Sequence, residues 1–267
     1  MTMTSADSAP VSNPAAGRLV LVANSLDLGT GVEVDLRLVL PGALIERAAG
    51  LTHWVAENAK TTRALLKRVA AICPLALPMQ QIQITELPRP AKGGGRPLGS
   101  TDLSPLLAPA LAGHDIGLLS EAGLPAVADP GAALVAAAHG LGIAVEPWSG
   151  PSSLLMALSA SGLNGQSFAF VGYLPVDAAQ RTQRLRALEN LSRQQGQTQI
   201  AIETPYRNEA LLAAMVAQLA PTTQLAVACG LTLPGGWCKT MRVAQWRQAA
   251  RAPMDPKLPA VFSWLAA

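Results

Sequence analysis

The chain is poor in charged residues, and this scarcity excludes several classes of protein. Charged residues occupy 14% of the 267 positions, whereas half of the residues are apolar. A disordered chain needs many charges and few apolar residues, so we expect a folded protein. The net charge is only +3. This excludes a histone-like polycation and leaves local basic patches as the means of binding a polyanion.

Cysteine and histidine are also scarce. The three cysteines, Cys73, Cys229 and Cys238, form no C-x-x-C pair, and the three histidines are scattered. Neither a disulfide framework nor a structural zinc site is therefore expected, and a reducing cytoplasm fits best. The longest charge-free runs, 147–176 and 210–238, are interrupted by glycine, proline, asparagine or glutamine. They predict buried core and no membrane span.

The first 17 residues lack the features of a signal peptide. They have neither a basic start nor an apolar stretch, and they are rich in Ser, Ala and Pro. We interpret residues 1–17 as a disordered lead-in. The chain also lacks a G-x-G-x-x-G motif, which disfavours an ordinary Rossmann cofactor domain.

What the chain does contain is a regular alternation of strand-like and helix-like segments. The expected strands are 18–23, 53–58, 82–87, 115–120, 142–147, 168–174, 198–204, 224–230 and 259–265. The expected helices are 42–50, 60–72, 102–112, 131–140, 152–160, 177–195 and 207–219, with loops at 24–41 and 88–100. This alternation predicts the α/β class with mainly parallel sheets, in two domains, 18–147 and 148–267.

Two loops stand out. The sequence LLSEAGLPAVADPG (118–131) follows an expected strand, and ligands bind at the carboxyl ends of strands in open parallel sheets. Its structural alternative is a plain connection in which Asp129 caps the next helix. The sequence PWSGPSSL (147–154) places Pro151 and Ser152 at a helix start, where backbone amides can hold a polar ligand group. It would also serve as an interdomain elbow.

Together these stretches resemble a known family. SEAGLPAVADPG, PWSGPSSLLMALSASGL and FVGYLP, which span 120–175, resemble the tetrapyrrole-methylase-like superfamily of S-adenosylmethionine-dependent methyltransferases. Within it they are most similar to the ribosomal RNA small subunit methyltransferase I family. VAENAKTTRALL (55–66) and IETPYRNEALL (202–212) are similar to further segments of that family.

The resemblance implies two α/β domains with an interdomain cleft that binds S-adenosylmethionine. It also implies methylation of the ribose 2′-O of small-subunit ribosomal RNA, RNA or the small ribosomal subunit as partner, no membrane association and a homodimer. The cofactor-binding residues that it implies are Leu119, Ser120, Glu121, Ala122, Gly123, Val127, Ser152, Ser153, Glu203 and Thr204.

The chain departs from the family pattern at several places. The first loop reads NSLDLGTG (24–31) where the family has Pro-x-Gly-Asn, Asn58 stands in place of an Asp, and Glu121 replaces the usual Asp. Two alternatives therefore stay open. One is a non-catalytic or altered-substrate descendant that keeps the cofactor, and the other is a tetrapyrrole methylase.

The sequence identifies no catalytic residue. Glu57 and Glu203 each follow an expected strand and are possible acceptors for the proton of a ribose hydroxyl. Both can equally be ordinary carboxylates at strand ends.

Three basic windows, 60–68, 89–96 and 181–193, carry a net charge of +10, which leaves −7 for the rest of the chain. Such patches contact phosphates without reading sequence, although each can also be a solvated helix face. Only ten aromatic residues exist, so platforms for stacking bases are few, and Trp148 is the one we single out. The candidate substrate-binding residues are Lys60, Arg63, Arg89, Lys92, Arg96, Arg181, Arg184 and Arg207.

Overall fold

The computed structural model describes residues 16–27, 29–88, 102–249 and 254–267. The chain divides into two compact units. The first contains the chain up to Ser25 and Asp35–Pro151, and the second contains Leu26–Val34 and Ser152–Ala267. The expected boundary at 147 lies four residues before the observed one, and the expectation did not include the assignment of 26–34 to the second unit. Of the expected lead-in, residues 1–15 lie outside the described residues.

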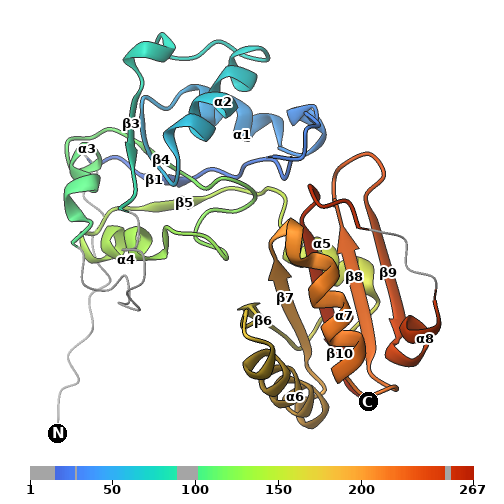
Figure 1. Cartoon of the computed structure of the whole chain (residues 1–267). Helices are drawn as coiled ribbons and strands as arrows, with labels where there is room; N and C mark the ends of the chain where they lie inside the picture. The colour runs from blue at the N-terminus through green and yellow to red at the C-terminus, as the bar shows by residue number, and fades with distance from the viewer. Residues whose placement is uncertain (1–15, 28, 89–101, 250–253) are drawn as a thin grey trace, which may run out of the picture. The chain divides into compact units, whose positions relative to one another are not determined.

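The first unit contains a parallel five-stranded sheet in the order β3-β2-β4-β1-β5 (Figure 1). Every described pairing in it is parallel. The strands are β1 (Leu19–Leu21), β2 (His53–Ala56), β3 (Gln83–Glu86), β4 (Ile116–Leu119) and β5 (Val145–Pro147). A parallel sheet is buried on both faces, which explains why all four residues of β4 are buried.

Helices cover both faces of this sheet (Figure 1). They are α1 (Gly42–Ala49), α2 (Ala59–Ala70), α3 (Ala108–Leu111) and α4 (Ala132–Gly140). Leu44 of α1 and Leu65 of α2 pack with Trp54 in one core cluster. Leu107 and Leu134 pack with Leu118 in a second cluster, which lies on the other face.

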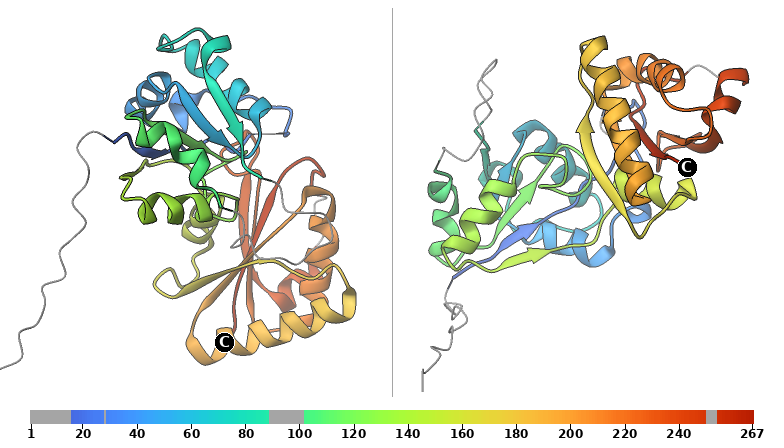
Figure 2. Two further views of the ribbon diagram at one scale, coloured as in Figure 1. Left: turned by 90° about the vertical axis from the view of Figure 1, so that its left-hand side faces the viewer. Right: turned by 90° about the horizontal axis from the view of Figure 1, so that it is seen from below.

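The second unit contains a five-stranded sheet in the order β6-β7-β10-β8-β9 (Figure 2). Only the pair β6–β7 is parallel, and the other three pairings are antiparallel. The strands are β6 (Phe168–Tyr173), β7 (Thr198–Glu203), β8 (Gln224–Cys229), β9 (Trp237–Arg242) and β10 (Ala260–Leu265). The α/β class is confirmed. The expectation of a mainly parallel sheet holds for the first unit and is wrong for the second.

The difference arises from the end of the chain. Strand β9 and the short helix α8 (Val243–Gln248) were not expected from the sequence. β9 pairs antiparallel with β8, to which a short loop joins it, so this connection needs no crossover helix. Among the described residues, no helix is long and apolar enough to cross a membrane.

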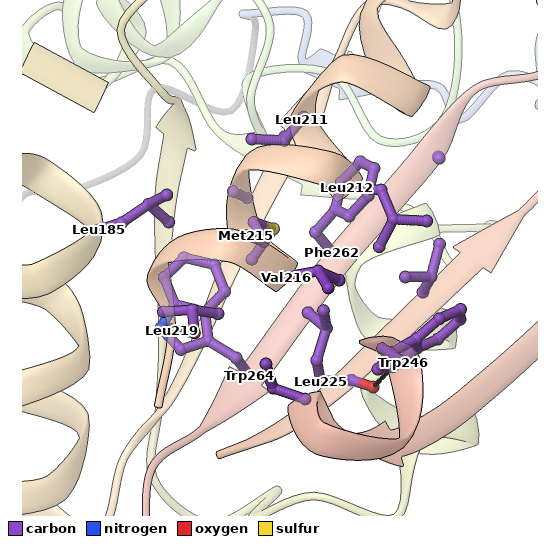
Figure 3. Packing of buried hydrophobic residues seen from close by; sticks show 14 of the residues in the cluster. Leu185, Leu211, Leu212, Met215, Val216, Leu219, Leu225, Trp246, Phe262 and Trp264 are labelled. Carbon is purple, nitrogen blue, oxygen red and sulfur yellow. Dashed lines mark hydrogen bonds between the residues drawn. The ribbon is translucent and has the colours of Figure 1, made fainter. Parts of the chain in front are cut away.

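The main core of the second unit lies between its sheet and helices α6 (Ala178–Gln195) and α7 (Asn208–Gln218). Figure 3 shows Leu211, Leu212 and Met215 of α7 packed toward Phe262 and Trp264 of β10. The Trp246 indole nitrogen of α8 donates to the carbonyl oxygen of Leu225 at 2.8 Å (Figure 3). Helix α5 (Ser153–Ser161) covers the opposite face, where Leu154, Ala157 and Leu158 pack against Ile200, Ala228 and Val261.

Candidate functional site

In the first unit, the loop that follows β4 is clamped by Asn24, which lies just after β1. The two backbones of Asn24 and Gly123 form an antiparallel bridge, with N···O distances of 2.9 and 3.2 Å. The Asn24 side-chain amide donates to the carbonyl oxygens of Glu121 at 2.9 Å and Ser120 at 3.3 Å. Ser25 in turn accepts a hydrogen bond from Arg68 of α2 at 3.0 Å. One buried asparagine therefore fixes the path of the loop 120–123.

The remainder of this loop has unusual backbone geometry. Gly123, Ala126 and Ala128 have φ values of 69°, 65° and 66°. The left-handed region costs an alanine roughly 1–2 kcal/mol, and such strain persists only where surrounding contacts hold it. Gly131, with a φ of 132°, is the N-cap of α4, which has no side-chain cap. The suggestion that Asp129 caps this helix is therefore wrong.

Three carboxylates lie at the carboxyl edge of the first sheet. Glu57 follows β2, whereas Glu121 and Asp129 belong to the loop after β4. The Glu57 carboxylate accepts the backbone N–H of Glu121 at 3.1 Å. Among the described residues, no lysine or arginine forms an ion pair with any of the three.

Burial and like charge raise the pKa of two of these carboxyl groups, Asp129 and Glu57. Burial, followed by repulsion from Glu57 and Glu121, raises the pKa of Asp129 to about 7. Burial is also the main cause that raises the pKa of Glu57, with a further contribution from Glu121. Buried carboxylates without a counter-charge favour the protonated form, so Asp129 can take up or release a proton near neutral pH.

Asn58 connects this carboxylate group to α2. Its side-chain oxygen accepts the backbone N–H of Lys60 at 2.9 Å and caps the helix, and its amide donates to the Glu121 carboxylate at 3.0 Å. Asn58 and Glu121, two of the positions that depart from the family pattern, therefore contact each other. An aspartate at 58 would have no donor for Glu121.

In the second unit, the start of α5 and the end of β7 hold the remaining candidates. Ser152 precedes α5 in an extended conformation, and its side chain makes no capping hydrogen bond. Ser153 is the first residue of that helix. The Thr204 hydroxyl also fails to cap and donates to the Glu203 carboxylate at 3.2 Å.

Glu203 is neutralised within its own loop. Its carboxylate pairs with the Arg207 guanidinium at 2.8 Å, while the Glu203 side chain is 1% exposed and that of Arg207 is 24% exposed. It also accepts the backbone N–H of Thr204 at 2.8 Å. This arrangement agrees with the interpretation of Glu203 as an ordinary carboxylate at a strand end. The guanidinium of Arg207, a candidate for substrate binding, is paired with that carboxylate.

The structure brings some predicted residues together and separates others. Leu119, Ser120, Glu121, Ala122, Gly123 and Val127 lie in one stretch of the first unit, and Ser152, Ser153, Glu203 and Thr204 lie in the second. Lys60 and Arg63 lie on the exposed side of α2, and Arg184 is exposed on α6. The Arg181 guanidinium donates to the carbonyl oxygens of Pro175 and Val176. Arg89, Lys92 and Arg96 lie outside the described residues.

Sequence reasoning missed Asn24, which stands in the loop that departs from the family pattern. The signal that could have indicated it is a polar residue directly after a buried strand. Trp148 proves unsuited to stacking bases, because its indole packs against the core and donates to the Glu146 carboxylate at 2.6 Å. Among the described residues, no group of three or more His, Cys, Asp or Glu is arranged to hold a metal ion.

Comparisons with known proteins agree with this geometry. The family model "Tetrapyrrole (Corrin/Porphyrin) Methylases" matches residues 104–236, which include the loop after β4, the start of α5 and the end of β7. The chain is similar to "Ribosomal RNA small subunit methyltransferase I" of Mesorhizobium japonicum, with 42% identity over 127 residues, 48% of this chain and 42% of that protein. The protein of the same name from Pseudomonas aeruginosa is 45% identical over 95 residues, 36% of this chain and 32% of that protein. In both cases the chain covers less than half of the relative's length.

Solved structures show the same fold at low sequence identity. The methyltransferase CobJ superposes with a TM-score of 0.53 and 18% identity over 93% of this chain and 94% of that chain. Uroporphyrin III C-methyl transferase from Thermus thermophilus gives a TM-score of 0.51 and 18% identity over 93% and 97%. These structures show a shared fold, and the family match assigns residues 104–236 of this chain to the tetrapyrrole (corrin/porphyrin) methylase family.

Proposed function

We propose that this chain is an S-adenosylmethionine-dependent methyltransferase that acts on small-subunit ribosomal RNA, at the 2′-oxygen of a ribose. The observation that carries the proposal is the 42% identity with a protein named as a ribosomal RNA small subunit methyltransferase. The matched family region also contains the clamped loop of the first unit. The alternatives, a non-catalytic descendant and a tetrapyrrole methylase, have no comparable observation in their favour.

The loop after β4 fits a cofactor of this kind. The Ser120 hydroxyl is buried, with 1% of the residue exposed, and has no hydrogen-bond partner among the described residues. A buried hydroxyl without a partner is costly unless a ligand supplies one. The uncompensated carboxylates Glu57, Glu121 and Asp129 also suit a cofactor that carries positive charge at its sulfonium and amino groups. Ser120–Gly123 and Val127 would hold the cofactor from the first unit, and Ser152, Ser153, Glu203 and Thr204 from the second.

When bound, S-adenosylmethionine supplies an activated methyl group, so the residues of the chain need only bind, orient and handle one proton. Methylation of a ribose hydroxyl releases that proton. Of the two candidate acceptors, Glu57 has no arginine or lysine partner in the part of the chain that the structure describes, whereas Glu203 is paired with Arg207. We therefore favour the Glu57 carboxylate, with Asp129 beside it, as the group that receives the proton.

The same proposal includes the partners and the location. Exposed Lys60, Arg63 and Arg184 would contact phosphates of RNA in the small ribosomal subunit. We further propose a homodimer, from the family resemblance, and a cytoplasmic location, where ribosomes are found. Sedimentation at micromolar concentration tests the dimer, and a monomer there would contradict it.

Two measurements test the function. Isothermal calorimetry with S-adenosylhomocysteine is expected to show binding, and tritiated-methyl transfer to small ribosomal subunits is expected to show incorporation into RNA. A chain that shows no heat and no thermal shift at millimolar product would overturn the cofactor assignment. Binding without incorporation into any RNA would instead favour the non-catalytic descendant.

A matched pair of variants sharpens the test. Glu57→Gln removes the favoured proton acceptor and is expected to lower the rate by about 100-fold, while product binding is retained. Glu86→Gln, on the neighbouring strand β3 and exposed, serves as the control and is expected to keep the rate.

A further inference from the structure

The three carboxylates at the carboxyl edge of the first sheet, Glu57, Glu121 and Asp129, are held together by the fold. The Glu57 carboxylate accepts the backbone N–H of Glu121 at 3.1 Å, and the Glu121 carboxylate accepts the Asn58 amide at 3.0 Å. Asp129 lies close enough to both glutamates for their charge to act on it, in addition to its burial. We call these three residues the carboxylate group.

The partners of the carboxylate group are neutral, so its negative charge is not compensated. Within the described parts of the chain, no lysine or arginine forms an ion pair with it. Elsewhere in the same unit, Asp115 and Glu146 share the Arg47 guanidinium at 2.7 and 3.0 Å. Repulsion among uncompensated, partly buried carboxylates opposes folding, so their presence together indicates a ligand that carries positive charge.

A separate observation indicates a ligand at the same loop. Ser120 directly precedes Glu121, and its hydroxyl is buried without a hydrogen-bond partner among the described residues. The Asn24 amide donates to the carbonyl oxygens of Ser120 at 3.3 Å and Glu121 at 2.9 Å, which holds the two residues in a fixed relation. The loop that we propose to bind the cofactor therefore includes one member of the carboxylate group.

The cofactor and its product differ in charge. In methyl transfer to a hydroxyl the S–CH₃ bond breaks, its electron pair stays on sulfur, an O–CH₃ bond forms and the hydroxyl proton passes to an acceptor. S-adenosylhomocysteine therefore carries one positive charge less than S-adenosylmethionine. A negative potential acts on that difference without direct contact, because screening in water at physiological salt takes effect over about 8 Å and is weaker at buried sites.

We propose that Glu57, Glu121 and Asp129 discriminate between the charged cofactor and the uncharged product, and so limit product inhibition. A bound cation relieves the repulsion within the carboxylate group, and loss of the cation restores that repulsion and favours release of the product. This inference rests on the proposed function and deepens it, since it gives the cofactor loop a preference between two ligands of nearly the same shape.

The test is calorimetry with the full chain at pH 8 and without RNA. The three ligands are S-adenosylmethionine, S-adenosylhomocysteine and sinefungin, in which an amine-bearing carbon replaces the methylated sulfur and keeps the positive charge. Both charged ligands are expected to bind at least about tenfold more tightly than S-adenosylhomocysteine. If sinefungin binds as weakly as S-adenosylhomocysteine, the chain recognises the methyl group and not the charge, and the proposal is overturned.

Two variants remove charge and keep the shape of the side chain. Glu121→Gln retains an oxygen that accepts the Asn58 amide, and Asp129→Asn has nearly the same size as the wild type. Each is expected to weaken binding of both charged ligands by about threefold to tenfold. The affinity for S-adenosylhomocysteine is expected to stay unchanged, which also shows that the loop is intact.

The matched control is Glu46→Gln, at an exposed position of α1. The neighbouring Arg47 pairs with Asp115, which directly precedes β4, whereas Glu121 lies beyond the other end of that strand. This variant is expected to keep all three affinities.

The outcomes separate this proposal from the proposed function. Equal wild-type affinities for S-adenosylmethionine and S-adenosylhomocysteine overturn the discrimination alone. Equal losses for all three ligands in Glu121→Gln and Asp129→Asn also overturn it, because the carboxylates then only maintain the loop. A wild-type chain that binds none of the three ligands overturns the cofactor assignment of the proposed function itself.

Discussion

Glu57 in the first unit directly follows β2 and Glu203 in the second is the last residue of β7, but the surroundings of these two strand-end carboxylates differ. Glu203 is neutralised by Arg207 and accepts hydrogen bonds from Thr204. Glu57 lies instead with Glu121 and Asp129, and burial and like charge raise its pKa. A buried carboxylate with a structural role is normally paired with a positive charge. A buried carboxylate without such a partner lowers the stability of the fold, and this indicates a functional role such as ligand binding.

The largest expected effect on stability is at the ion pair between Glu203 and Arg207. Arg207→Ala would leave the buried Glu203 carboxylate uncompensated, and we expect a loss of about 3 kcal/mol in the free energy of unfolding of the second unit. Urea denaturation followed by Trp fluorescence measures this change. The double variant Glu203→Gln, Arg207→Ala is expected to regain part of the loss, and a double variant that is no more stable than Arg207→Ala would contradict the neutralisation argument.

A smaller effect is expected at Asn58, whose side-chain amide donates a hydrogen bond to the Glu121 carboxylate. Asn58→Asp keeps the cap of α2 but removes the donor to Glu121 and adds a fourth negative charge. We expect a loss of about 2 kcal/mol in the stability of the first unit. Adding Glu121→Gln, which removes the repulsion and supplies an amide, should restore most of it. If Asn58→Asp is as stable as the wild type, the contact between Asn58 and Glu121 carries no energy.

The third prediction concerns pH. The pKa of Asp129 is raised, so the folded state binds its proton more tightly than the unfolded state does. Stability from this group is therefore complete below pH 3.8 and is lost as the pH rises to about 7. Asp129→Asn should gain on the order of 1 kcal/mol over the wild type at pH 8, after allowance for partial exposure, and nothing at pH 4. Denaturation at the two pH values checks this, and a difference that does not change with pH would contradict it.

The smallest expected effect is at the buried hydroxyl. Ser120→Ala removes a group that has no partner among the described residues, so the stability should change by no more than about 0.5 kcal/mol. The affinity for S-adenosylhomocysteine should nevertheless fall severalfold, as calorimetry can measure. A variant that loses stability without losing affinity would assign Ser120 to the fold and not to the site.

Much of this architecture was predictable from the sequence, because local patterns determine single elements. The strands from 18 to 120 and the helices that follow Asn58 and Asp177 are confirmed within a few residues. The expected helix 102–112 is divided into a 3-10 turn, Ser104–Leu107, and α3, since Pro105 and Pro109 each lack an N–H for a continuous helix.

The parts that sequence reasoning missed depend on contacts between distant residues. The antiparallel pairing of β10 with β7 and β8 has no local signal. The clamp from Asn24 to Glu121 joins residues 97 positions apart. The ion pair of Glu203 with Arg207 and the grouping of Glu57 with Glu121 and Asp129 depend on the folded chain, and a single sequence does not reveal them.

Because residues 26–34 belong to the second unit, the order of synthesis on the ribosome differs from the order in which the units can be completed. These residues emerge early, but their partners, Ser152–Ala267, are translated last. A nascent chain must therefore keep this segment unassembled while the first unit forms, and closure of the long intervening loop slows completion of the second unit. An expression fragment that begins at residue 152 would lack a part of its own fold.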